Sequence, residues 1–180
     1  MSRLILLNKP SGVLTQFTSE AGYATLKDFV VVPNVYPAGR LDVDSEGLVL
    51  LTDDGVLQAR IANPRHKLAK RYWVQVEGVP ESADLTHLAN GLDLGDFVSA
   101  TCECKIIDEP ASLWPRTPPI RVRASIPTTW LEIILREGKN RQIRRMTAKI
   151  GHPCLRLIRY SIGRWTLQDM QPGQWREEKI

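Results

Sequence analysis

The sequence has no apolar run that approaches the roughly 20 residues of a membrane-spanning helix. It also has neither of the glycine patterns, G-x-G-x-x-G and G-x-x-x-x-G-K-[ST], that hold nucleotide phosphates. The first absence predicts a protein without a membrane span, for which the cytoplasm is the default location. The second argues against a nucleotide cofactor.

Cysteine is scarce, with only Cys102, Cys104 and Cys154 in 180 residues. An odd number favours reduced thiols over a disulfide framework, which agrees with a cytosolic location. The C-x-C spacing differs from the C-x-x-C of zinc sites, and no histidine stands where a zinc ligand is expected. We therefore predict no metal site, and we expect Cys102 and Cys104 to share one face of a strand.

Acidic residues are nearly absent from two segments that are rich in lysine and arginine. Residues 60–71 contain five basic residues and no acid, and residues 136–164 contain nine basic residues and one acid. Arg141 and Arg145 lie four residues apart, and like charges at that spacing destabilise a helix unless an anion compensates. The two segments predict a face that binds phosphate.

Short alternating or apolar segments predict an α+β fold with a mainly antiparallel, mixed sheet and flanking helices and loops. We expect one domain over residues 1–180, or two lobes that share a cleft. The predicted strands are 4–7, 48–52, 71–77, 97–107 and 131–135; the predicted helices are 24–29, 56–62, 81–90 and one that Asn140 caps and Gly151 ends.

The stretch "GRLDVDSEGLVLLTDDG" at 39–55 carries five carboxylates. Asp42, Asp44 and Glu46 before Gly47 match the start of an EF-hand calcium loop. Prolines upstream and the "LVLLT" strand downstream, however, leave no place for the two helices of that motif. A pair of acids, as in glycosidases, suits the spacing but leaves the basic segments unexplained.

A third interpretation joins the acidic stretch to the second basic segment. Asp42 follows Arg40 and Leu41 in a loop that leads into a buried strand, where a carboxylate can lie at the floor of a cleft. The helix capped by Asn140 offers Arg144 or Arg141 as the cation that holds this carboxylate. We therefore expect Asp42 to act alone, with Asp44, Glu46 and Asp53 as loop and turn acids that cap neighbouring amides.

Four motifs carry a resemblance to a known family: "NKPSG" at 8–12, the stretch at 39–55, Tyr72 in "KRYWVQVEG", and "EGKNRQIRRM" at 137–146. Their order and spacing resemble the pseudouridine synthases, in the branch that modifies bacterial ribosomal RNA at single sites. The resemblance extends from Leu4 to about Trp175. Many members of that branch begin with a small RNA-binding domain, and we expect none ahead of the catalytic part here.

The resemblance implies a pseudouridine synthase catalytic fold with its active site in a central basic cleft. It implies that one uridine of 23S ribosomal RNA is flipped out of its stack and isomerised to pseudouridine. Asp42 is then the essential carboxylate, either as nucleophile or as base on the sugar, without metal or organic cofactor. The protein is expected to be a monomer.

The resemblance also implies roles for four further residues. Arg144 pairs with Asp42 and keeps it ionised. Ile143 lies under the uracil, and Tyr72 stacks on the base and relays a proton. Arg40 fills the space that the flipped nucleotide leaves.

The remaining basic side chains are expected to hold RNA phosphates, which position the substrate without reading its sequence. These residues are Arg65, Lys67, Lys70, Arg71, Lys139, Arg141, Arg145, Arg156 and Arg159, and Lys9 of "NKPSG" is also expected at the substrate. One alternative function stays open, a non-catalytic RNA-binding or ribosome-assembly protein. It would use the basic segments and would need none of Asp42, Tyr72 and Arg144.

Overall fold

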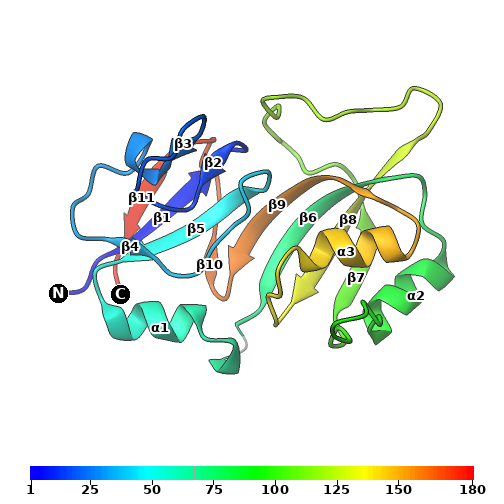
Figure 1. The fold of residues 1–180 in the computed structure, drawn as a ribbon, viewed down its shortest axis with the longest axis horizontal. Coiled ribbons are helices and arrows are strands. Elements are labelled where there is room, and N and C mark those ends of the chain that lie inside the picture. The colour runs from blue at the N-terminus through cyan, green and yellow to red at the C-terminus, as the bar shows by residue number, and fades with distance from the viewer. Residues whose placement is uncertain (67) are drawn as a thin grey trace.

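The computed structural model describes residues 1–66 and 68–180, and one large sheet runs through it (Figure 1). Its strands are β1 (Leu4–Lys9), β4 (Tyr36–Pro37), β5 (Glu46–Thr52), β6 (Lys70–Glu77), β7 (Glu103–Ile107), β8 (Thr128–Leu135), β9 (Cys154–Ile162), β10 (Trp165–Thr166) and β11 (Trp175–Glu178). The order across the sheet is β11-β1-β5-β9-β6-β8-β7, with β4 beside β5 and β10 beside β9. The ladders are antiparallel except for the β5 and β9 pair, so the mixed, mainly antiparallel sheet was predicted correctly.

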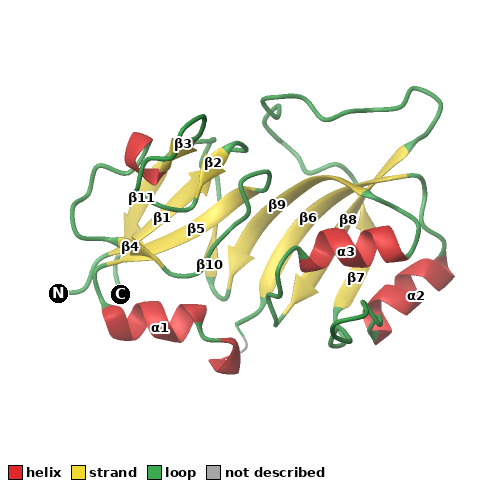
Figure 2. Ribbon diagram, viewed as in Figure 1, coloured by secondary structure: helices red, strands yellow, loops and turns green. Residues whose placement is uncertain are grey.

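Helices cover the sheet unevenly, as Figure 2 shows. The helix α1 (Gly55–Ala62) lies near the half of the sheet that β11, β1 and β5 form, which we call the first half. The helices α2 (Ser82–Asn90) and α3 (Gln142–Lys149) lie on the second half, which β9, β6, β8 and β7 form. Two 3-10 turns, Leu26–Asp28 and Pro64–His66, complete the helical segments. None of the described helices is both long and apolar enough to cross a membrane.

The core extends across both halves of the sheet, because one cluster joins Leu48 and Leu50 of β5 to Ile158 and Ile162 of β9. In the second half of the sheet, the alternate residues Tyr72, Val74 and Val76 of β6 face α3 and pack with Ile143 and Met146. In the first half, β1 and β5 are buried on both faces, and even their polar residues Asn8 and Thr52 are less than 2% exposed. The strand pattern of residues 71–77 and the buried run at 48–52 are therefore confirmed.

Three predicted elements differ from the observed ones. The predicted helix at 24–29 is the short strand β3 (Ala24–Thr25), which pairs with β2 (Val13–Leu14), followed by the first 3-10 turn. The predicted strand at 97–107 is formed only at 103–107. The last helix begins at Gln142, and its N-cap is Arg141 rather than Asn140, because Arg141 takes a left-handed backbone conformation with φ 53°.

Candidate active site

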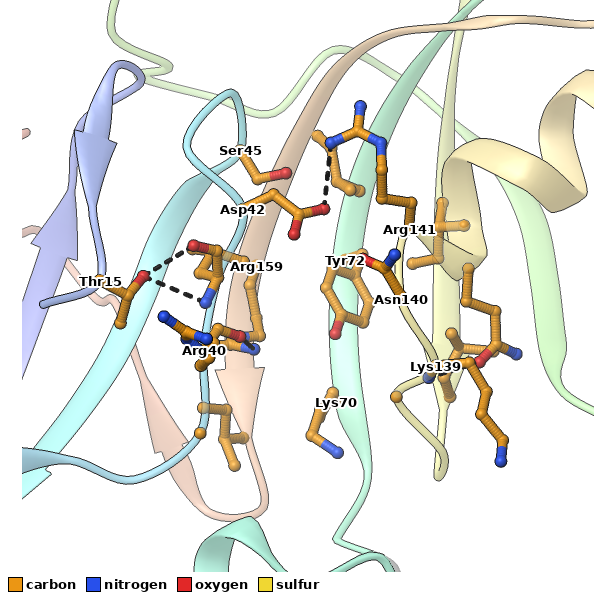
Figure 3. A pocket seen from close by; sticks show the side chains of 18 of the residues that line it. Thr15, Arg40, Asp42, Ser45, Lys70, Tyr72, Lys139, Asn140, Arg141 and Arg159 are labelled. Atoms are coloured by element: carbon orange, nitrogen blue, oxygen red, sulfur yellow. Dashed lines mark hydrogen bonds and ion pairs between the residues drawn. The ribbon is translucent and has the colours of Figure 1, made fainter. Parts of the chain in front are cut away.

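The two halves of the sheet join where β5 pairs with β9 through only two residue pairs, Glu46 with Ile158 and Gly47 with Arg159. We call this junction the seam. A cavity of about 590 Å³ takes side chains from both sides of the seam (Figure 3). The short parallel ladder thus places an open cleft at the middle of the sheet.

Asp42 lies in the turn that leads into β5, and its carboxylate points into the cleft (Figure 3). The turn is closed by the Ser45 amide, which donates to the Asp42 carbonyl at 3.0 Å. Thr15 holds the residue before Asp42: its Oγ1 donates to the Leu41 carbonyl at 2.7 Å and accepts from the Leu41 amide at 3.2 Å. The carboxylate therefore extends from a backbone that is held on both sides.

The cation beside Asp42 is Arg141. Its Nη1 lies 3.4 Å from Asp42 Oδ2, and its fork donates to both oxygens of Asp44 at 3.1 and 2.9 Å. These bonds lower the pKa of the Asp44 carboxyl below its ordinary value. One guanidinium thus bridges two carboxylates across the cleft and leaves the second oxygen of Asp42 open to it.

The prediction that Arg144 pairs with Asp42 is wrong for this structure. Arg144 Nη2 instead donates to the Asp44 carbonyl and to Ser45 Oγ, both at 3.2 Å, and its side chain is not among those that line the cavity. The difference follows from the helix start. Arg141 precedes the first helical residue in a left-handed conformation, and its side chain reaches Asp42, whereas that of Arg144 reaches Asp44 and Ser45.

Tyr72, Ile143 and Leu157 are among the apolar side chains of the lining. Tyr72 is 8% exposed and lies on β6 directly opposite Arg159 of β9. Ile143 comes from the first turn of α3. A phenol ring and two aliphatic side chains next to a carboxylate suit a flat, partly apolar ring such as a nucleobase.

The rim and floor of the cleft carry positive charge. Arg40, Lys139 and Arg141 are exposed cations of the lining, and Lys70 is half-buried among them. Burial, and then the nearby charge of Arg159, lower the pKa of the Lys70 ammonium. The predicted cluster of Arg40, Asp42, Lys70, Tyr72, Lys139, Arg141 and Ile143 is therefore brought together in one cleft.

Lys9 was predicted at the substrate and lies elsewhere. It is fully buried, and its ammonium donates to the carbonyls of Pro10 and Val13 at 2.8 Å and of Val43 at 3.4 Å. Burial lowers its pKa to about 7, against a partial opposing effect of Glu46. The burial of Lys9 has a physical cause, because three main-chain carbonyls surround its ammonium at the end of β1.

Arg156 was also predicted to hold a phosphate and is buried instead. Its guanidinium makes a two-point ion pair with Glu46 at 2.8 and 2.9 Å and donates to the Trp114 carbonyl. Trp114 Nε1 donates to the same carboxylate at 2.8 Å. Glu46, expected as a turn acid, is therefore the buried partner of Arg156 across the seam.

Three other predicted phosphate ligands, Arg65, Arg71 and Arg145, lie outside the cavity lining, whereas Arg159 is part of it. Arg71 is paired with Glu132 at 3.5 Å, and Arg145 is paired with Asp96 and lies over the ring of Phe97. Arg65 is exposed in the second 3-10 turn, and Lys67 lies outside the described residues. Arg159 is 5% exposed and bonded to main-chain carbonyls.

Two residues that shape the cleft escaped the sequence analysis. Thr15 fixes Leu41, as described above, and Gln142 fixes the turn opposite, because it donates to Glu137 at 2.7 Å and accepts from the Lys139 amide at 3.1 Å. The "EGKNRQ" spacing gives a weak local signal for Gln142. Thr15 gives none, since its partner is 26 residues away.

The part of the chain that the structure describes contains no group of three or more His, Cys, Asp or Glu side chains that could hold a metal ion. Asp42 and Asp44 share a cation instead. The cleft thus combines the Asp42 carboxylate, apolar side chains with a phenol, and several cations. This combination can bind a nucleotide and place a carboxylate against its sugar.

The family model for RNA pseudouridylate synthase matches residues 3–149. The chain belongs to this family. Two curated relatives are both named ribosomal large subunit pseudouridine synthase E. The one from Vibrio vulnificus is 55% identical over 97% of this chain and 74% of its own length, and the one from Xanthomonas campestris is 53% identical over 96% and 94%.

A solved pseudouridylate synthase structure has the same fold as this member of the family. It superposes with a TM-score of 0.81 at 28% identity, over 99% of this chain and 71% of the solved chain. The family resemblance of the four motifs and the predicted fold class are both confirmed by these matches.

Proposed function

We propose that this pseudouridine synthase isomerises one uridine of large-subunit ribosomal RNA, the 23S RNA, with Asp42 as the essential carboxylate. The geometry of Asp42 carries the proposal: its open oxygen faces a nucleotide-sized cleft while Arg141 holds the other oxygen. The names of the two relatives above support the choice of the large subunit.

The reaction cuts the bond between N1 of uracil and C1′ of the ribose, turns the uracil and joins its C5 to C1′. Asp42 acts on the sugar, as nucleophile at C1′ or as base, while the detached base stays in the pocket. Ile143 and Tyr72 enclose the base, and the phenol is placed to relay the proton that leaves C5. Arg141 supplies the positive charge beside Asp42 and is one of the two arginines that the sequence offered for this role.

The cations at the rim serve the RNA strand. Arg40 follows the cleft edge and is proposed to occupy the space of the expelled nucleotide, which offsets part of the few kcal/mol that base flipping costs. Lys70 and Lys139 are proposed to hold neighbouring phosphates. All these groups come from one chain, so we propose a monomer that acts in the cytoplasm, where ribosomal RNA is available.

The test uses the full chain with ribosomal RNA that lacks pseudouridine. Asp42→Asn keeps the size of the side chain and removes its charge and nucleophilicity. We expect RNA affinity close to that of the wild type and a loss of pseudouridine formation of roughly a thousandfold or more. Pseudouridine mapping in a strain that lacks the protein then identifies the site.

A normal rate for Asp42→Asn would show that Asp42 is not the catalytic group. Complete absence of pseudouridine formation by the wild-type chain, on free RNA and on assembling subunits, would favour the non-catalytic RNA-binding alternative. Salt dependence of binding does not distinguish the two functions, because both use the same cations.

A further inference from the structure

Arg159 is a buried cation whose hydrogen bonds go to the main chain of the catalytic segment. Its Nε donates to the Leu48 carbonyl at 2.8 Å, and its Nη1 donates to the Arg40 carbonyl at 3.4 Å. These two carbonyls flank Asp42, one before it and one after it. A single planar guanidinium therefore ties the entry and the exit of the loop that presents the carboxylate.

The backbone of Arg159 is fixed against the same loop. Gly47 pairs with Arg159 at the seam and has φ 111°, and a β-carbon at Gly47 would lie 2.3 Å from the Arg159 carbonyl oxygen. Only glycine permits this approach. Because main chain and side chain of Arg159 both hold the loop, the position of Asp42 is coupled to β9 on the far side of the seam.

The burial of Arg159 does not suit an RNA-binding role. Arg159 is only 5% exposed, whereas Lys139 and Arg141 of the same cleft are exposed. The two hydrogen bonds described above go to carbonyls, and its charge adds to the effect of burial in lowering the pKa of Lys70. A phosphate would have to displace the bond to Arg40 to reach Nη1.

We infer that Arg159 is a positioning residue that holds the loop 40–48, and with it Asp42, at the distance from the sugar that the reaction needs. The inference rests on the proposed function and adds a residue that lines the cleft and acts through Asp42. A misplacement of about 1 Å of a catalytic group can cost roughly a hundredfold in rate. Arg159 therefore contributes to the rate at which bound RNA is isomerised and not to RNA affinity.

The decisive variant is Arg159→Lys, which keeps the charge but cannot donate to both carbonyls at once. Its matched control is Arg176→Lys. Arg176 of β11 likewise donates to two carbonyls, those of Leu167 at 3.2 Å and Thr166 at 2.7 Å, but lies away from the cleft lining. Rates are measured in single turnover with saturating protein, and affinity is measured separately by equilibrium RNA binding.

We expect Arg159→Lys to lower the single-turnover rate roughly tenfold to a hundredfold, with RNA affinity within about twofold of the wild type. Arg176→Lys should leave both quantities unchanged. Weaker binding with a normal rate for the bound RNA would overturn the inference and return Arg159 to the phosphate ligands. An unchanged rate with unchanged binding would overturn it as well.

Amide hydrogen exchange provides a readout that does not depend on activity. In Arg159→Lys the amides of residues 43–48 should exchange faster, while those of residues 4–7 stay as in the wild type. This measurement tests the positioning role even if the wild-type chain isomerises no uridine. Equal exchange across residues 43–48 would contradict it.

A second variant covers the case in which Arg159→Lys does not fold. Thr15→Val removes the uncharged hydroxyl that holds Leu41 in the same loop and keeps the size of the side chain. We expect the same pattern with a smaller effect, a lower rate for bound RNA at unchanged affinity. A loss of affinity alone would count against the role of loop position in catalysis.

Discussion

Two pairs of cations near the cleft use positive charge in different ways. Lys9 and Arg159 are buried and donate to main-chain carbonyls. Lys139 and Arg141 are exposed, and Figure 3 shows them on the side of Tyr72. Each pair has one lysine and one arginine, yet the buried pair shapes the backbone and the exposed pair faces the solvent that RNA would replace.

This difference explains why a charge count alone misassigned several residues. The basic segment 136–164 contains Arg156 and Arg159, which are buried in β9, and Lys139 and Arg141, which are exposed in the turn before α3. A buried cation must find fixed acceptors, whereas an exposed one keeps its affinity for a mobile anion. The contrast predicts opposite results when each kind is removed.

The largest effect is expected at the buried ion pair of the seam. Glu46→Gln leaves the Arg156 guanidinium buried without its carboxylate, which typically costs about 3 to 5 kcal/mol of unfolding free energy. Denaturant unfolding measures the loss. The matched control is Glu177→Gln, whose exposed pair with Arg3 should matter little. Equal losses in the two variants would show that burial at the seam adds nothing.

Lys9 sharpens the comparison through pH. Its folded-state pKa of about 7 lies below the ordinary value of 10.5, so between these values the unfolded chain binds more protons than the folded protein. Stability from this group therefore rises with pH above about 7. Lys9→Met should lack this rise. The free energy of unfolding of the wild type minus that of the variant should therefore increase from pH 7 to pH 9.

The pH experiment compares denaturant unfolding of the two proteins at each pH, so that other titrating groups cancel. The slope of the difference cannot exceed about 1.4 kcal/mol per pH unit for one proton. A constant difference would mean that Lys9 stays protonated in the folded protein across this range.

The smallest effect is expected at the exposed cations. Lys139→Ala should weaken RNA binding a few-fold and reduce the salt slope of log K by about 0.7 to 0.9, the value of one phosphate contact. The single-turnover rate at saturation should stay normal. A lower rate with an unchanged salt slope would place Lys139 with the buried cations in its effect.

Much of the fold follows from local sequence pattern. The alternation in "RYWVQVE" and the apolar run "LVLLT" each specify a strand, and Asp54 caps α1 by accepting from the amides of Val56 and Leu57. The motifs likewise bring Asp42, Tyr72 and Ile143 to one cleft. These features depend on neighbours within a few residues, or on a family pattern that spans the chain.

What the sequence did not predict depends on contacts between distant residues. Arg156 meets Glu46 across 110 positions, and Arg141 meets Asp44 across 97. Which arginine of "RQIRR" reaches Asp42 depends on the left-handed conformation at Arg141, a departure that propensity does not indicate for arginine. The 3-10 turn after β3 similarly depends on the pairing of β3 with β2.

Gly47 and Gly39 differ in how much substitution the backbone tolerates near the catalytic loop. At Gly39, φ is 88° and nothing lies within 4 Å of an added β-carbon, so asparagine, which enters the left-handed region most readily, has space there. Every replacement of Gly47 drives a carbon into the Arg159 backbone. Position 47 therefore allows no side chain, because β5 and β9 approach each other there more closely than a β-carbon permits.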